Sequence, residues 1–216
     1  MKVVLKLGGS LLKEAKALMV QLVQEFEESK TPEEGKTPVS ILIVPGGGMF
    51  ADTVRKADQS LGLSQDAAHW MAVLGMEQYA CYLLDKTGAL AVDSIQNLPY
   101  GVRVFLPFKL LKKEDPLPHS WDVTSDTIAA WAAKSIGARL VKVTNVDGIF
   151  KDGRLLKEIS TSELQGDCKS CVDLALPAFL QNNSMECMIV NGKFPERVIG
   201  AIYGKPVLGT VIKGNI

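Results

Sequence analysis

Apolar residues follow one another without a break in two short stretches of the chain, at positions 3–5 and 41–44. Runs of this kind are typical of strands buried on both faces of a parallel sheet. Each stretch leads into glycines, Gly8 and Gly9 after the first and Gly46 to Gly48 after the second. Apolar residues at helical spacing follow each turn. Because parallel α/β sheets present ligands at the carboxyl ends of their strands, the pattern predicts a ligand site at these two glycine turns.

The rest of the chain alternates between helical and strand periods. Ser10 is expected to cap the first helix, and Thr124 or Ser125 a later one. Helices are expected at 11–26, 49–60, 66–83, 124–136 and, interrupted by Pro177, 171–179, and strands at 3–7, 40–44, 102–106, 139–144, 186–190 and 206–212.

The helix expected over residues 66–83 carries a stripe of small and flexible apolar side chains. Such a stripe packs in a core, and its Gly and Ala residues also suit the close approach of a second subunit. Both interpretations, core and homo-oligomer interface, are open at this point. The stripe comprises Ala68, Met71, Ala72, Gly75, Met76, Tyr79, Ala80 and Leu83.

Composition places the chain among ordinary globular proteins, with 216 residues of which 47% are hydrophobic and 22% charged. One domain over residues 1–216 is expected. The net charge is +0, so no overall field favours nucleic acid or a membrane surface, and a cytoplasmic location is expected. Cys168 and Cys171 have the spacing of a metal or redox pair, but no second pair accompanies them, which favours free thiols.

The first turn has the outline of a phosphate site. Lys6 supplies a positive charge, Gly8 and Gly9 allow backbone amides to approach an anion, and Ser10 begins a helix whose N-terminus is partly positive. A glycine-rich turn without a ligand fits the same residues. Asp126, at the start of a helix, is favoured there by the helix dipole and needs no other role. Neither a Walker loop nor a dinucleotide fingerprint is present, so any phosphate chemistry has to be built differently.

Lys6, the two glycine turns, Asp126 and the Thr-x-x-Asp-Gly segment that starts at Thr144 together resemble the amino acid kinase family. The resemblance implies a single-domain, three-layer α/β/α sandwich with an open, mostly parallel, eight-stranded sheet. It implies ATP over the carboxyl-terminal half of the sheet and a small anionic acceptor over the amino-terminal half. Mg²⁺ would be held mainly through the ATP phosphates, with no metal site of protein residues.

The same resemblance assigns roles to individual residues. The implied catalytic set is Lys6, Gly9, Asp126 and Lys169, where Lys169 is the candidate for a second lysine that contacts phosphate. The implied nucleotide-binding residues are Gly8, Ser10, Thr144, Asp147, Gly148, Phe150 and Lys151. The implied acceptor-binding residues are Gly46, Gly47, Gly48, Asp52, Arg55, His69, Trp121 and Asp122. Asp52 and Arg55 are also spaced to pair with each other on a helix, and Trp70 and Trp121 are of a type more often found in cores.

Four segments, 45–52, 68–72, 120–126 and 189–193, are similar to the branch of this family associated with methanofuran biosynthesis in archaea and related cofactors in methylotrophs. The implied reaction is ATP-dependent phosphorylation of [5-(aminomethyl)furan-3-yl]methyl phosphate to its diphosphate. Two alternatives stay open: a kinase for another small acid, such as an amino-acid carboxylate or an isoprenoid phosphate, and a nucleotide-binding protein without turnover. The segment 46–50 contains no histidine, which counts against an isoprenoid phosphate.

Overall fold

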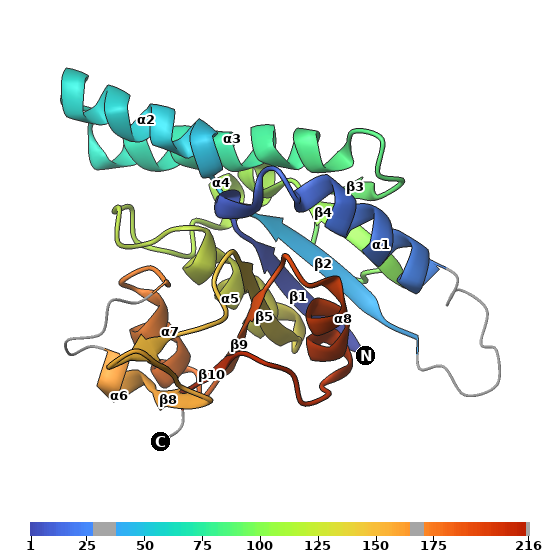
Figure 1. Ribbon diagram of the computed structural model, residues 1–216. Helices are drawn as coiled ribbons and strands as arrows, with labels where there is room; N and C mark the ends of the chain where they lie inside the picture. Colours follow the sequence, from blue (N-terminus) through green and yellow to red (C-terminus); the bar gives the residue numbers. More distant parts are fainter. Residues whose placement is uncertain (28–37, 165–170, 215–216) are drawn as a thin grey trace.

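A central sheet of eight strands organises the structure, a computed structural model that describes residues 1–27, 38–164 and 171–214 (Figure 1). The strand order is β3-β4-β2-β1-β5-β9-β10-β8. All neighbouring pairs in it are parallel except β9 and β10. The predicted α/β class and the open, mostly parallel sheet are thereby confirmed. The strands are β1 (Lys2–Leu7), β2 (Ser40–Pro45), β3 (Leu90–Val92), β4 (Gly101–Phe105), β5 (Arg139–Thr144), β8 (Glu158–Ser160), β9 (Glu186–Asn191) and β10 (Thr210–Lys213).

Helices cover both faces of this sheet and form the outer layers of the sandwich. Helices α1 and α8 lie on one face and α5 and α7 on the other, while α2 and α3 pair beyond the carboxyl end of β2 (Figure 1). The helices are α1 (Ala15–Glu27), α2 (Gly48–Leu61), α3 (Gln65–Leu84), α4 (Pro107–Glu114), α5 (Ser125–Ile136), α6 (Thr161–Leu164), α7 (Leu176–Asn182) and α8 (Pro195–Tyr203). No helix among the described residues is long and apolar enough to cross a membrane.

Strand β1 is central to both hydrophobic cores because its side chains alternate between the faces of the sheet. Val3, Leu5 and Leu7 belong to the core beneath α1 and α8, and Val4 belongs to the core beneath α5. Lys6 follows Val4 in this alternation and therefore lies on the α5 face. A lysine is thus placed among buried side chains, where its charge requires a partner.

The apolar stripe of α3 packs inside the chain. Gly75 lies against the backbone of α2, where an added Cβ would be 3.1 Å from the Ala51 nitrogen, so glycine permits the close packing of these two helices. Val73 and Met76 join one core and Tyr79 the other. The core interpretation is confirmed for these positions, and the homo-oligomer stays a prediction.

Three local expectations were wrong. Residues 171–175 are not helical: α7 begins at Leu176, because Pro177 occupies the first turn of a helix, where its missing amide costs nothing. The last strand begins at Thr210 instead of 206. Ser10 does not cap α1 but lies in a short 3₁₀ helix, Gly9–Leu11, and its hydroxyl is 3.5 Å from that of Thr144. Short elements of two to four residues, β3, β8, α6 and the hairpin β6 (Phe150–Lys151) with β7 (Arg154–Leu155), were not expected.

Candidate active site

The two glycine turns lie directly against each other at the carboxyl ends of β1 and β2. The Gly46 amide donates to the Leu7 carbonyl at 2.8 Å, and the Gly8 amide donates to the Val143 carbonyl at 3.0 Å, which joins the first turn to β5 as well. A Cβ on Gly9 would lie 2.2 Å from the Gly48 Cα. Glycine is required at this contact because no side chain fits between the two backbones.

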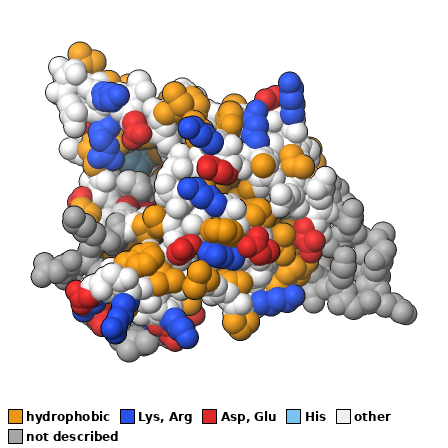
Figure 2. Space-filling model, viewed as in Figure 1, with side chains coloured by type: hydrophobic (Ala, Val, Ile, Leu, Met, Phe, Trp, Pro, Cys, Tyr) orange, Lys and Arg blue, Asp and Glu red, His pale blue; other side chains and the backbone are white. Residues whose placement is uncertain are grey.

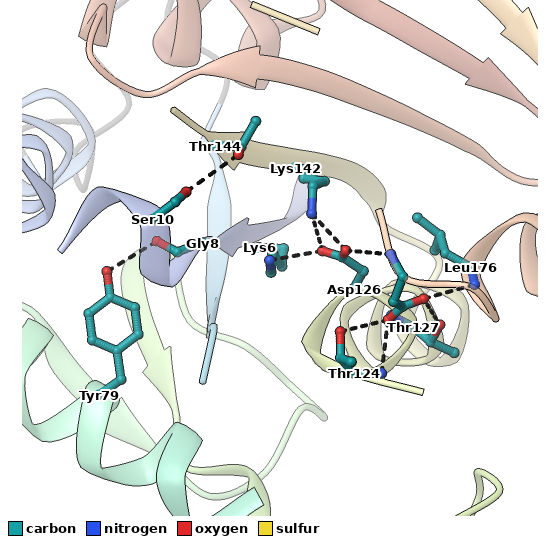
Figure 3. Close-up of polar contacts among 11 residues, drawn as sticks. Lys6, Gly8, Ser10, Tyr79, Thr124, Asp126, Thr127, Lys142, Thr144 and Leu176 are labelled. Atoms are coloured by element: carbon teal, nitrogen blue, oxygen red, sulfur yellow. Dashed lines mark hydrogen bonds and ion pairs between the residues drawn. The ribbon is translucent and has the colours of Figure 1, made fainter. Parts of the chain in front are cut away.

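Two lysines share one carboxylate beside these turns (Figure 3). Lys6 and Lys142 are register partners on β1 and β5, and Asp126 lies in the first turn of α5 above them. Lys6 Nζ is 2.9 Å from Asp126 Oδ1, whereas Lys142 Nζ is 2.5 Å from Oδ1 and 2.6 Å from Oδ2. All three are buried: Lys6 is 8% exposed, Lys142 4% and Asp126 5%. Asp126 therefore does more than favour a helix start: it compensates two buried cations.

Burial and the three charges together set the pKa values of this cluster. Burial lowers the pKa of Lys6 below its ordinary value, against the influence of Asp126, and the charge of Lys142 adds to the lowering. Burial acts likewise on Lys142, but the carboxylate that contacts it through both oxygens outweighs burial and raises its pKa. Burial also disfavours the Asp126 carboxylate, yet the two ammonium groups lower its pKa to about 2. Lys6 thus carries the less compensated charge and is the lysine that an incoming anion would stabilise.

A cavity of about 550 Å³ opens beside Lys6. The glycine turns form its floor, and α2, α3 and residues 120–128 form its walls; Figure 2 shows the surface hollowed below α2 with histidine visible inside. Its apolar lining includes Ala72, Val73 and Met76. Seven of the eight residues that sequence assigned to the acceptor line this cavity, namely Gly46, Gly47, Gly48, Asp52, Arg55, His69 and Trp121. The eighth, Asp122, is exposed and lies outside the lining, where its carbonyl accepts the Ala175 amide.

One wall of the cavity is a stack of a cation on an aromatic ring. The guanidinium of Arg55 lies 4.2 Å from the centroid of Trp121, whose indole nitrogen donates to Asp58 at 2.7 Å. Arg55 thus stacks on Trp121, and the ion pairs within the described part of the chain do not include one between Arg55 and Asp52, contrary to the alternative suggested by their spacing. Asp52 is exposed at the cavity and has no ion-pair partner among the described residues.

Two histidines stack beside α3, the helix that carries His69. The rings of His69 and His119 are 4.2 Å apart and inclined by 17°, and only His69 lines the cavity. His119 contacts Asp66 at 2.6 Å and Asp115 at 2.8 Å, and the hydrogen bond with Asp66 contributes most to the raised pKa of His119. Burial, reinforced by the charge of His119, lowers the pKa of His69 to about 4. At neutral pH His69 therefore presents a neutral imidazole to the cavity.

The residues assigned to the nucleotide lie at the carboxyl ends of β1 and β5 and in the segment that follows β5. Thr144 is the register partner of Asn191, and Asp147 accepts hydrogen bonds from Asn191 at 2.9 Å and Arg197 at 2.8 Å. Gly148 has φ +149° and lies against Thr210, a position that excludes a side chain. Phe150 and Lys151 are exposed on the hairpin that follows. Gly8, Ser10 and Thr144 are thus brought together, while the hairpin residues lie farther along the same segment.

Sequence reasoning missed three polar residues that the structure brings to this region. Lys142 carried a usable signal, since a lysine inside an apolar strand is as unusual there as Lys6 is in β1. Asn191 ends β9 as Thr144 ends β5, which is also a usable signal. Asp173, whose backbone amide donates to the Asp126 carboxylate, carried no signal in the sequence. Lys169 falls outside the described residues, so its role stays a prediction.

No group of three or more His, Cys, Asp or Glu side chains suited to a metal ion occurs in residues 1–27, 38–164 and 171–214. Lys6 and the first glycine turn, which line the cavity, offer an ammonium group and backbone amides to an anion.

A parallel α/β sheet that joins two glycine turns, two buried lysines and a shared carboxylate beside one cavity supplies the positioning and positive charge of a phosphoryl-transfer enzyme. The comparisons agree with this class. The model of the amino acid kinase family matches residues 1–102 and 101–191, and the chain belongs to this family. It is accordingly an ATP-dependent kinase.

Two curated relatives match over nearly their full length. The [5-(aminomethyl)furan-3-yl]methyl phosphate kinase of Methanocaldococcus jannaschii is 33% identical over 220 residues, which cover 98% of this chain and 97% of that protein. The uridylate kinase of Methanobrevibacter smithii is 27% identical over 235 residues, covering 98% and 99%. Among solved structures, uridylate kinase from Archaeoglobus fulgidus superimposes with a TM-score of 0.66 at 23% identity, covering 98% of this chain and 100% of the other. This last likeness supports the fold.

Proposed function

We propose that this kinase transfers the γ-phosphoryl group of MgATP to [5-(aminomethyl)furan-3-yl]methyl phosphate and forms the corresponding diphosphate. The observation that carries the proposal is the lining of the 550 Å³ cavity, which combines a buried lysine, an arginine, an apolar wall and a carboxylate that has no ion-pair partner in the described part of the chain. The relative from Methanocaldococcus jannaschii, which bears the name of this activity, supports the same acceptor.

The reaction needs no general base from the protein. A phosphate monoester is mostly ionised at neutral pH, so one of its oxygens attacks the γ-phosphorus as it stands. The new P–O bond forms while the bond between the γ-phosphorus and the β,γ-bridging oxygen breaks, and ADP leaves with the electron pair. Lys6 would stabilise the charge on the transferring group, and the neighbouring glycine amides would fix its position.

The cavity suits an acceptor that is anionic at one end and cationic at the other. The phosphate would lie at Gly47 and Gly48, where the N-terminus of α2 has no side-chain cap and its free amides favour an anion. The furan ring would occupy the apolar part that Val73 and Met76 line, and the aminomethyl group would pair with Asp52.

Lys142 bears on the alternative of a nucleotide-binding protein without turnover. That alternative rested on an incomplete set of lysines, and Lys142 supplies a second buried cation beside the first. A kinase for an amino-acid carboxylate would leave Asp52 facing another acid, which is unfavourable. We further propose that the enzyme acts in methanofuran-type cofactor biosynthesis, binds Mg²⁺ with ATP and is a cytoplasmic homo-oligomer.

The test is a set of acceptors incubated with MgATP and the enzyme, with ADP release followed continuously and the product identified by ³¹P NMR. The set contains the aminomethylfuran phosphate, its analogue with methyl in place of aminomethyl, UMP, isopentenyl phosphate and N-acetylglutamate. We expect the highest kcat/KM with the aminomethylfuran phosphate and a diphosphate signal in its product. Preferred turnover of UMP or of the carboxylate would contradict the proposed acceptor and leave the kinase assignment intact.

A further inference from the structure

A second carboxylate, Asp173, lies directly behind the lysine-binding carboxylate. It belongs to the segment that precedes α7, and its own backbone amide donates to Asp126 Oδ2 at 3.0 Å. Asp126 Oδ1 is occupied by both lysines and Oδ2 by Lys142 and this amide. Among the described residues, each oxygen thus has two partners, and the Asp173 amide is the one partner that is not a lysine.

The side chain of Asp173 fastens this amide to the start of α5. Its Oδ2 accepts from the Thr124 amide, the Thr124 hydroxyl and the Thr127 amide, at 2.9, 2.9 and 3.0 Å. Its Oδ1 accepts from the Thr127 hydroxyl at 2.7 Å and the Leu176 amide at 2.9 Å. One carboxylate therefore caps the first turn of α5 and the start of α7 together (Figure 3 shows the threonines, Leu176 and Asp126).

This cap is unusual because it comes from a segment 46 to 49 residues away in the sequence. Thr124 occupies the N-cap position of α5, yet its hydroxyl donates to Asp173 and makes no capping bond to its own helix. The orientation of the first turn of α5 consequently depends on Asp173. Asp126 is the second residue of that turn, so the direction of its carboxylate depends on the same contact.

We propose that Asp173 is a positioning residue for phosphoryl transfer, which orients the Asp126 carboxylate toward Lys6 and Lys142 by clamping the α5 N-terminus to the segment before α7. Asp173 contacts neither lysine and acts through Asp126. Without the clamp, Asp126 can rotate about its Cβ–Cγ bond, and the two ammonium groups lose their fixed direction. The inference rests on the kinase family and on these contacts, and it does not depend on which acceptor is used.

A double-mutant cycle separates this role from simple stabilisation of the fold. We expect Asp126→Asn to lower kcat about 100-fold and Asp173→Asn about 10-fold, and the double variant to match Asp126→Asn within about twofold. If the effects multiply instead, to about 1,000-fold, Asp173 acts independently of Asp126 and the proposal is wrong. A kcat for Asp173→Asn equal to that of the wild type overturns it as well.

Two further variants test whether the fall in kcat comes from this contact and not from misfolding or from the loss of any helix-capping carboxylate. Thr127→Val removes one donor to Asp173 at nearly constant volume, and we expect a smaller fall in kcat, about threefold, that also vanishes in the Asp126→Asn background. Glu163→Gln is the matched control, because Glu163 accepts the Ser160 amide at 3.0 Å at the start of α6 and takes no part in the lysine cluster. Its kcat should equal that of the wild type.

The same cycle is measured for MgATP binding by calorimetry, which needs no acceptor. Non-additive changes in Kd would support the role of Asp173 even if no acceptor in the set is turned over, and additive changes would refute it. Failure of the acceptor proposal therefore appears as absent or misdirected turnover. Failure of the positioning proposal appears as additivity in Kd, so the two outcomes are distinguishable.

Discussion

Lys6 and Lys142 stand opposite each other on neighbouring parallel strands and share the carboxylate of Asp126. The two ammonium groups repel each other. Because a single carboxylate compensates them, the three side chains together carry a net positive charge. That surplus lies beside a cavity whose floor consists of backbone amides. The arrangement is costly for folding and useful for binding phosphate, which is characteristic of functional sites.

Lys6→Ala should lower kcat by about 100-fold or more, because the charge on the transferring phosphoryl group loses its nearest cation. The fold should survive, since Asp126 keeps Lys142 and the Asp173 amide as partners. Steady-state kinetics with circular dichroism measure both quantities. Lys109→Ala, which removes an exposed lysine paired with Asp93, is the control and should leave kcat unchanged. A Lys6→Ala variant of nearly normal rate would show that Lys6 is misassigned.

Lys142→Ala should reduce both activity and stability. Lys142 contacts both oxygens of Asp126, so its removal leaves a buried carboxylate with one cation instead of two. Breaking a buried pair costs about 3 kcal/mol, and the remaining partners keep the expected loss at the lower end of the known range. Urea denaturation measures the loss. An unchanged free energy of unfolding would mean that the ion pair does not form in solution.

The turns and the strands that carry them were predictable because their signals are local. Continuous apolar runs followed by glycines identify β1 and β2, and a lysine inside such a run identifies Lys6. Lys142 carries the same signal in β5 but no glycine follows it. Lys142 was not considered, because the family resemblance implied a second lysine late in the chain, at Lys169, which lies outside the described residues.

The remaining contacts of the site join residues that are distant in the sequence, and no local pattern encodes them. His69 and His119 stack although fifty positions separate them, and Asp173 caps a helix that begins long before it. Pro177 could have been interpreted as the start of a helix instead of an interruption, because its missing amide is tolerated only in the first turn. The hairpin at Phe150 has strands too short to show any period.

Gly9→Ala should lower kcat at least tenfold and destabilise the protein. The new Cβ would meet the Gly48 backbone at 2.2 Å, so one of the two turns has to move, and both line the cavity. Overpacking of this kind costs about 1–3 kcal/mol. Gly62→Asn is the control, because Gly62 has open space around it and asparagine tolerates its left-handed backbone. Equal activity of both variants and the wild type would show that the turns do not need their close contact.

The two histidines predict opposite effects of pH on stability. The pKa of His69 falls from 6.5 to about 4 on folding, so the unfolded chain binds more protons between these values and stability declines as pH falls through this window. The raised pKa of His119 has the reverse sign: its contribution is complete below 6.5 and is lost as pH rises through its folded value. His69→Gln should therefore show a smaller loss of stability than the wild type between pH 6.5 and 4 in urea titrations. A parallel decline in both proteins would contradict the shift.

Asp52→Asn should raise KM for the aminomethylfuran phosphate about tenfold, equivalent to about 1.4 kcal/mol, with kcat nearly unchanged. Asp52 lines the cavity and has no ion-pair partner among the described residues, so its charge is available to an ammonium group on the acceptor. The methyl analogue of the acceptor is the control for the protein change, because it lacks the charge that Asp52 would pair with. Its KM should be high with the wild type and should not rise further with the variant. If Asp52→Asn raises KM equally for both compounds, Asp52 shapes the cavity without recognising the amine, and the cationic end of the acceptor has to bind elsewhere.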